Sequence, residues 1–247
     1  MRKIAVALSK GGVGKTTTAV NLAAGLADAG RRVLLVDLDT QDQAARMLGV
    51  DPAAGIAELV AGDLPADDAL FPAREKLTLL AGGSSLAGLK RIIARKDFGG
   101  ERTVSDALTP LDDRFDYVVI DTAPGWDTLA INALFYADEI LTPVALEVLA
   151  VQGLLDFARN VQSIQQYHDR LTLRYVLPTF MDRRVKKSGE ILAQLEESFG
   201  DRVCAPIRYN VRLSEAPGYG QTIFEYAPRS SGAEDYAALT ERILYHE

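Results

Sequence analysis

The sequence predicts an α/β protein with a doubly wound, mostly parallel sheet covered by helices on both faces. Apolar runs of strand length alternate with segments of helical composition along the chain, which is typical of βαβ units. The runs are predominantly apolar, as expected for strands buried on both faces of a parallel sheet. A glycine-rich turn follows the first run directly, at the edge where ligands bind in such sheets.

The expected elements follow in order along the chain. We expect strands at residues 3–8, 32–37, 77–80, 117–121, 140–143 and 173–177. Helices are expected at residues 17–29, 41–48, 85–95, 104–111, 128–136, 151–167, 187–199 and 232–245. Gly30 suits the left-handed position that ends the first helix. Because no repeat, low-complexity tract or linker divides the sequence, we expect one domain spanning residues 1–247.

Composition narrows the functional class. An apolar content of 48% with 25% charged residues is ordinary for a soluble globular protein. No apolar run has the length of a signal peptide or a membrane span. Cys204 is the only cysteine, which excludes disulfides within the chain and metal sites built from several cysteines. The cytoplasm is the expected compartment.

Residues 9–17 read SKGGVGKTT and form a phosphate-binding loop between the first strand and the first helix. The usual pattern, G-x-x-x-x-G-K-[ST], requires glycine where this chain has Ser9. The loop glycines, which are Gly11, Gly12 and Gly14, let backbone N–H groups point at phosphate oxygens. A strand, a glycine-rich turn and a helix N-terminus together make an anion site, and this context outweighs a chance glycine-rich turn.

The loop carries one lysine more than a phosphate site needs. Lys15 supplies the charge for the terminal phosphates, and the Thr16 hydroxyl suits Mg²⁺. Val13 and Thr17 complete the expected nucleotide-binding loop. Lys10 has no role in that scheme. We expect it to point outward, toward a phosphate on another molecule.

Aspartates end two further strands at the same sheet edge. Asp121 follows three apolar residues and fits a Walker B carboxylate, which holds Mg²⁺ through water. Asp39 is the better candidate to orient the attacking water and also reaches Mg²⁺ through water. Asp37 fits a structural role as well as a catalytic one. For each aspartate the alternative is a helix cap or turn.

The segment after Asp121 suits a switch that responds to hydrolysis. Gly125 gives the backbone freedom beside the terminal phosphate. Trp126 has two interpretations. It is either a packing residue or, if exposed, a subunit contact.

Charge is distributed unevenly. The net charge is −7, which argues against nucleic-acid binding over the whole surface. Residues 170–212 nevertheless hold more basic than acidic side chains, and local charge decides whether a polyanion docks. The densest basic cluster consists of Arg183, Arg184, Lys186 and Lys187. The alternative interpretation is a solvated basic face.

Four segments together resemble the ParA/Soj-type partition ATPases of the deviant Walker A (MinD/ParA) family. They are residues 10–17, residues 36–41 (VDLDTQ), residues 119–124 (VIDTAP) and residues 210–217 (NVRLSEAP). The last is the most specific, and the resemblance covers nearly the whole chain. The length implies the small form, without an N-terminal DNA-binding domain.

The resemblance implies ATP and Mg²⁺ as cofactors and a homodimer in the ATP state, with Lys10 reaching the partner subunit's ATP. It also implies non-specific binding to double-stranded DNA on the nucleoid. A ParB-like or other cargo-adaptor protein would stimulate slow hydrolysis and release the dimer, with no membrane involved. Arg208 and Asn210 would join the nucleotide site, and Arg208 and Arg212 would join the basic cluster in contacting DNA.

The chain departs from the family pattern at several positions. The family usually has proline and glycine where this chain has Thr40 and Asp42. The switch commonly reads Asp-x-Pro-Pro, whereas this chain has Ala123-Pro124 followed by Gly125-Trp126. The family motif Ile-Pro-Arg-Asn becomes Ile207-Arg208-Tyr209-Asn210. The proline of that motif lies against adenine and its arginine contacts DNA in relatives, so Tyr209 alters an inherited DNA contact.

Three other functions share this loop. A membrane-cycling relative of the MinD kind needs a basic amphipathic C-terminal helix, but residues 235–247 contain one cation, Arg242. An iron–sulfur reductase needs cluster-ligating cysteines, and Cys204 alone cannot provide them. A metabolic kinase or synthetase would not explain residues 210–217. The sequence does not identify the cargo.

Overall fold

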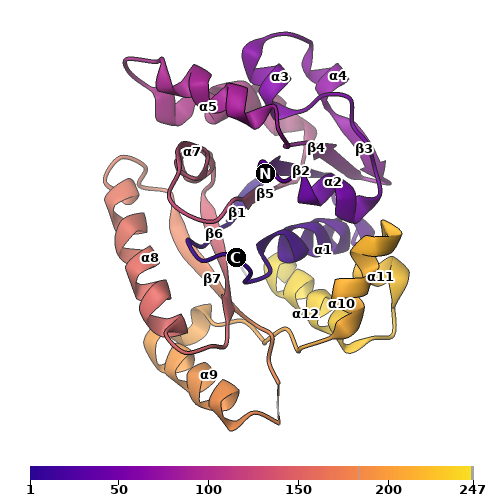
Figure 1. The fold of residues 1–247 in the computed structure, drawn as a ribbon, viewed down its shortest axis with the longest axis vertical. Helices are drawn as coiled ribbons and strands as arrows, with labels where there is room; N and C mark the ends of the chain where they lie inside the picture. The colour runs from indigo at the N-terminus through magenta and orange to yellow at the C-terminus, as the bar shows by residue number, and fades with distance from the viewer. Residues whose placement is uncertain (183, 246–247) are drawn as a thin grey trace.

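A seven-stranded sheet forms the centre of the protein (Figure 1). The computed structural model describes residues 1–182 and 184–245. The strands are β1 (Arg2–Val6), β2 (Val33–Leu38), β3 (Phe71–Arg74), β4 (Leu77–Leu80), β5 (Tyr117–Thr122), β6 (Glu139–Ala145) and β7 (Thr172–Thr179). Their order in the sheet is β3-β4-β2-β5-β1-β6-β7. Only the β3–β4 pair is antiparallel, so the predicted fold class is confirmed.

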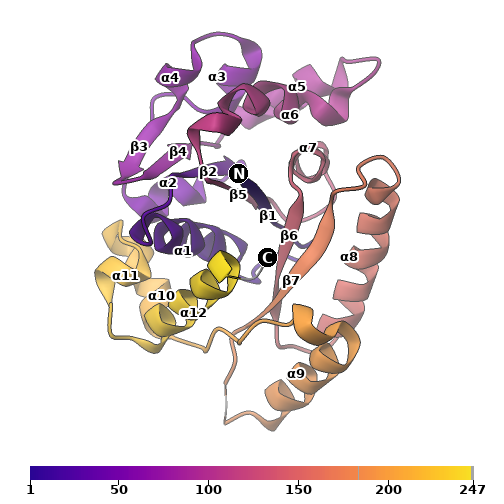
Figure 2. The ribbon, with the colours of Figure 1, turned by 180° about the vertical axis from the view of Figure 1, so that it is seen from behind.

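Helices cover both faces of the sheet (Figures 1 and 2). The α-helices are α1 (Lys15–Asp28), α2 (Gln43–Leu48), α3 (Ile56–Ala61), α4 (Ala66–Ala69), α5 (Leu86–Ala94), α6 (Thr103–Leu108), α7 (Thr128–Tyr136), α8 (Ala150–Gln165), α9 (Lys186–Phe199), α10 (Val211–Glu215), α11 (Ile223–Tyr226) and α12 (Ser231–Tyr245). Short 3₁₀ helices are η1 (Gly100–Arg102), η2 (Thr109–Arg114), η3 (Gly200–Arg202) and η4 (Ala216–Tyr219).

Each expected strand and helix is present, with ends that differ by a few residues. β3, α3, α4, α10 and α11 are present in addition to the expected elements. β3 is a four-residue edge strand that contains Pro72, and its pairing with β4 includes a register shift. Proline removes a backbone donor and suits such an edge strand, and no continuous apolar run marks this strand. The additional helices have at most six residues, too short to show a helical period.

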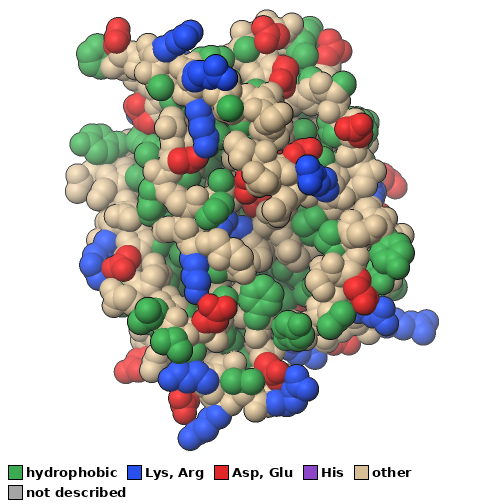
Figure 3. Space-filling view, viewed as in Figure 1, with side chains coloured by type: hydrophobic (Ala, Val, Ile, Leu, Met, Phe, Trp, Pro, Cys, Tyr) green, Lys and Arg blue, Asp and Glu red, His purple; other side chains and the backbone are tan. Residues whose placement is uncertain are grey.

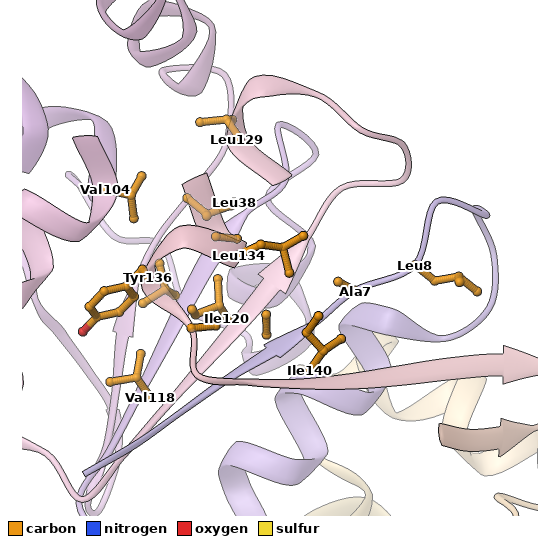
Figure 4. Packing of buried hydrophobic residues seen from close by; sticks show 14 of the residues in the cluster. Ala7, Leu8, Leu38, Val104, Val118, Ile120, Leu129, Leu134, Tyr136 and Ile140 are labelled. Carbon is orange, nitrogen blue, oxygen red and sulfur yellow. The ribbon is translucent and has the colours of Figure 1, made fainter. Parts of the chain in front are cut away.

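Alternate side chains of each central strand enter two separate cores. Ala5 of β1 and Ile120 of β5 pack with α5, α6, α7 and α8 on one face of the sheet. Figure 4 shows Ile120 and Leu134 among the side chains of this cluster. Ile4 of β1 and Val119 of β5 pack with α1 and α12 on the other face. This alternation follows from the two-residue period of a strand. Because the central strands are packed on both faces, their carboxyl ends are held in place. The loops that carry the site start from these ends.

Candidate nucleotide-binding site

The carboxyl ends of β1, β2 and β5 meet at one edge of the sheet, as parallel pairing requires. Asp37 of β2 and Asp121 of β5 are direct neighbours in register, and Val6 of β1 pairs with Asp121 from the other side. A cavity of about 730 Å³ opens at this edge. Its lining includes most of the phosphate loop, Asp39, the start of the switch segment and residues 207–210.

The phosphate loop has the backbone shape that its glycines predict. Gly12 and Gly14 have φ angles of 71° and 88°, which residues with a Cβ rarely adopt. Gly14 is the residue that precedes α1, so the helix begins at Lys15 and its free N–H groups face the cavity. The Thr179 hydroxyl donates to the Val13 carbonyl at 3.0 Å and ties the loop to the end of β7.

Lys15 lies beneath the loop with 6% of its surface exposed. Its Nζ donates to the Lys10 carbonyl at 2.9 Å. Burial lowers the pKa of the Lys15 ammonium, while Asp121 and Asp39 favour its charged form. A buried cation at a helix N-terminus beside two carboxylates suits a polyphosphate that carries a divalent metal.

Asp121 is a buried acid of the site whose carboxylate is unsatisfied. It is fully buried, and neither carboxylate oxygen has a hydrogen bond of good geometry to any described residue. Burial raises the pKa of Asp121 well above its ordinary value, and the neighbouring Asp37 raises it further, whereas the Thr16 hydroxyl and Lys15 act in the opposite direction. Such a group needs a proton or a cation. Mg²⁺ takes one or two carboxylates and completes its shell with water and phosphate, so Thr16 and Asp121 fit this ion.

Asp37 and Asp39 have different roles in the turn after β2. The Asp37 carboxylate, fully buried, accepts hydrogen bonds from Asp39 N at 2.8 Å and Ala44 N at 3.2 Å. Burial raises the pKa of Asp37 to about 7. These bonds shape the turn, which favours the structural interpretation of Asp37. Asp39, 9% exposed, lines the cavity, and its Oδ1 accepts a hydrogen bond from Gln41 N at 3.0 Å.

Asp42 occupies a position that suits glycine. Its φ and ψ angles are 52° and 41°, in the left-handed region, and its Oδ1 is buried without a partner among the described residues. Burial also raises the pKa of Asp42. Glycine, which the family usually has at this position, adopts the left-handed conformation without strain. Aspartate lowers the stability of the fold here, because its Cβ is strained in this conformation.

Asp42→Gly is expected to raise the free energy of unfolding by about 1 kcal/mol, because it removes a strained Cβ and an unpaired buried oxygen. Urea unfolding at neutral pH measures the difference. Asp42→Ala is the matched control, since it removes the carboxylate and keeps the Cβ, and it should gain less. A glycine variant less stable than the original protein contradicts this account.

Lys10 is half-exposed but not free within the chain. Its Nζ lies 2.7 Å from Glu147 Oε2, with exposed side-chain fractions of 50% and 63% for the two residues. Lys10 is therefore exposed, as expected. Its pairing with Glu147 of the same chain was not expected. A surface ion pair of this kind is weak, so Lys10 can exchange Glu147 for a phosphate at little cost.

The switch segment after β5 lies against the phosphate loop. A Cβ added at Gly11 would lie 3.7 Å from the Pro124 Cβ, and Gly125 has a φ angle of 102°. The Trp126 ring stacks on Phe157, with ring centroids 5.1 Å apart, and its Nε1 is buried. Trp126 is thus a packing residue in this conformation. Asp127 then caps α7 by accepting from Leu129 N and Ala130 N.

Arg208 is bound to acids rather than exposed for DNA. Its guanidinium contacts Asp235 Oδ1 at 2.7 Å and Glu234 Oε2 at 2.9 Å. The contact of Arg208 with DNA stays a prediction, and it would require the guanidinium to exchange these two carboxylates for a phosphate. Asn210 caps α10 through Arg212 N and also donates to Ser231 Oγ. Both residues line the cavity, so their predicted place at the nucleotide is retained.

The remaining predicted DNA contacts lie around the start of α9 and on α10. Arg184 is 85% exposed and pairs with Asp182, and Lys186 is 93% exposed with Glu190 at 3.6 Å. Lys187 is exposed, whereas Arg212 pairs with Glu215 on α10. Arg183 lies outside the described residues. On the face drawn in Figure 3, basic and acidic side chains are interspersed and form no single basic surface.

Sequence reasoning missed several cavity residues. Lys90 of α5, Phe180 after β7 and Tyr236 of α12 line the cavity, and Glu147 holds Lys10. All four are distant in sequence from the phosphate loop. Phe180 alone carries a local structural signal, a φ angle of 57° in a bulky residue, which appears only once the chain is folded.

Comparison with known proteins agrees with this geometry. A family model described as an AAA domain matches residues 1–173. The chromosome-partitioning ATPase Soj of Thermus thermophilus is 38% identical, over 99% of this chain and 96% of its own length. The sporulation initiation inhibitor protein Soj of Bacillus subtilis is also 38% identical, over 97% of each chain. A solved structure of a cobyrinic acid a,c-diamide synthase from Mycobacterium smegmatis, with bound ADP and magnesium, is 34% identical with a TM-score of 0.86, covering 100% of this chain and 95% of that one.

The doubly wound sheet, the phosphate loop with its second lysine and the two strand-end aspartates define a P-loop ATP hydrolase. Within that class, the full-length similarity places the chain more narrowly. The chain belongs to the Soj/ParA family of partition and positioning ATPases.

Proposed function

We propose that this protein is an ATP-dependent positioning ATPase that dimerises on ATP, binds DNA without sequence preference and is released by partner-stimulated hydrolysis. The observation that carries this proposal is Lys10, a half-exposed cation at the rim of the phosphate loop whose only ion pair among the described residues is a surface one. A cation delivered by a second subunit stabilises charge in the transition state, as an arginine finger does.

Within one subunit, the chain's own residues would bind and orient ATP. The N–H groups of residues 11–16 and the Lys15 ammonium hold the phosphates, while Thr16 and Asp121 would hold Mg²⁺. When bound, Mg²⁺ neutralises charge on the terminal phosphates. Asp39 would orient the attacking water, and Lys10 of the partner subunit would complete the site.

The Mg²⁺ requirement is expected to depend on pH. Because the pKa of Asp121 is raised, protons compete with the cation for its carboxylate, and apparent Mg²⁺ affinity should fall as the pH is lowered. Hydrolysis rates measured across Mg²⁺ concentrations at several pH values give this affinity. The change of this apparent affinity with pH must be larger than the change with pH in the affinity of Mg²⁺ for free ATP, measured in the same buffers without protein. A requirement independent of pH contradicts the assignment of Asp121.

The cations around α9 support binding to DNA phosphates. Positive charge in the first turn of a helix gains nothing from the helix dipole, so the dipole of α9 does not account for Lys186 and Lys187. They remain exposed. Each phosphate they neutralise adds salt dependence to binding.

Reversing Arg183 and Arg184 to glutamate is expected to abolish ATP-dependent retention of duplex DNA while dimerisation persists. Reversing Lys186 and Lys187 should do the same, and this pair lies wholly within the described residues. Gel-shift assays with and without ATP measure retention, and sedimentation measures the dimer. Arg31→Glu with Arg170→Glu, at two other exposed arginines, is the matched control. Unchanged retention in both cluster variants would refute the patch.

The structure gives no support to a membrane-cycling function. The α12 side chains Ala233, Tyr236, Leu239 and Ile243 are buried in the core beside α1, so the apolar face that a membrane anchor needs is already covered. Among the described residues, no helix combines the length and apolar character that a bilayer crossing requires. Co-sedimentation with liposomes in the presence of ATP tests this alternative, which predicts binding.

A further inference from the structure

The end of α5 presents cations around an exposed aromatic ring. Arg91, Arg95 and Lys96 are exposed, and none of them has an acidic partner among the described residues. Phe98, just beyond them, is 95% exposed. In Figure 3 the projection above α5 shows basic side chains beside a protruding hydrophobic group. We call Arg91, Arg95, Lys96 and Phe98 the α5 patch.

The opposite side of α5 is fixed in the protein core. Leu86, Leu89 and Ile93 are buried in the cluster shared with α7. The α5 patch is therefore held on a rigid helix and the short loop that follows it. An aromatic ring in water gains by burial in a partner, and aromatic and arginine side chains are the residues that anchor protein interfaces.

The charges around Phe98 favour a peptide over a nucleic acid. Asp97 and Glu101 lie on either side of Phe98 in the sequence. A continuous phosphate backbone would be repelled by these acids. A peptide can place separate carboxylates against the cations and an apolar side chain against the ring.

α5 also contacts the switch segment. Lys90 Nζ lies 2.6 Å from Asp127 Oδ2, and Asp127 caps α7 directly after residues 122–126. Within that stretch, Pro124 lies against Gly11 of the phosphate loop. A shift of α5 therefore reaches the phosphate loop through one ion pair and one short loop.

We infer that the α5 patch docks an acidic peptide segment with an apolar anchor from a partner protein, and that the Lys90–Asp127 pair relays docking to the switch segment. The docking rests on the patch alone. The relay to hydrolysis rests on the function proposed above, since it assumes that residues 122–126 respond at the terminal phosphate.

Trp126 provides a direct readout, because it is the only tryptophan and lies in the switch segment. The probes are a fluorescein-labelled peptide of glutamate and leucine, its lysine and leucine counterpart, and a labelled duplex DNA. In the absence of ATP, anisotropy should show binding of the acidic peptide only, with affinity lowered about tenfold or more by Arg95→Glu with Lys96→Glu and by Phe98→Ser. Arg31→Glu with Arg170→Glu is the matched charge control and should leave this affinity unchanged.

Docking should change the emission of Trp126, and Lys90→Met should remove that change while the peptide still binds. Failure of the acidic peptide to bind, or binding that none of the patch variants weakens, overturns the docking site. Binding of DNA with the same variant sensitivity also overturns it, by making the patch a nucleic-acid surface. An emission change that persists in Lys90→Met overturns the relay. ATP-dependent DNA retention should be normal in the patch variants, so failure of the proposed function would be seen separately.

Discussion

Replacing Lys10 with alanine is expected to lower the rate of ATP hydrolysis by about a thousandfold while nucleotide affinity stays nearly unchanged. The side chain of Lys10 contacts Glu147 and lies half-exposed, so it contributes little to a single subunit. The Lys15 ammonium bonds to the backbone carbonyl of Lys10, which the substitution keeps. Steady-state hydrolysis and equilibrium binding of a fluorescent ATP analogue measure the two quantities.

Mixing two inactive variants tests whether Lys10 acts across the dimer. Lys10→Ala retains its own Asp39, and Asp39→Ala retains Lys10. In a mixed dimer, the site on the Lys10→Ala subunit would have both groups, because its partner supplies the lysine. Hydrolysis should therefore reappear on mixing. If the mixture stays inactive although mixed dimers form, Lys10 acts within its own subunit and the dimer proposal loses its main support.

The fold could be predicted because its central strands are buried on both faces. Such strands are mostly apolar up to an acid near the carboxyl end, so the strands expected at residues 32–37 and 117–121 stand out in the sequence. Their right-handed connections fix which edge holds the loops. β3 could not be predicted in this way. It is half-exposed, contains Pro72 and pairs through a register shift, so its strand conformation depends on β4 and not on its own side chains.

The same contrast holds in the site. The phosphate loop and Asp121 were predictable because glycine spacing and a strand-end acid are local patterns. The pairing of Arg208 with Asp235 was not, since the two residues lie 27 positions apart and meet only when α12 packs beside residues 207–210. Sequence shows where a cation is, whereas the folded chain decides whether its charge is available. The charge of Arg208 is neutralised by Asp235 and Glu234, whereas the side chain of Lys186 is 93% exposed.

Asp39→Ala is expected to lower the hydrolysis rate by about a hundredfold or more, with ATP affinity within about threefold of the original protein. The Oδ1 atom of Asp39 is held by Gln41 N, and its Oδ2 atom makes no hydrogen bond to any described residue. This arrangement fixes the carboxylate at the cavity wall with one oxygen available to a water. Asp37 lies behind it and holds the turn through Asp39 N, so the position of residue 39 does not depend on its own side chain.

Asp39→Asn separates charge from shape. The amide can keep the bond to Gln41 N but cannot accept a proton from the attacking water, so this variant should be nearly as slow as the alanine variant. Asp37→Asn is the contrasting change, because it should lower the free energy of unfolding and leave a folded fraction that still hydrolyses ATP. Single-turnover hydrolysis with urea unfolding distinguishes the two residues. Hydrolysis at the normal rate by Asp39→Ala would show that another group orients the water, whereas loss of stability without loss of rate would assign Asp39 to the turn.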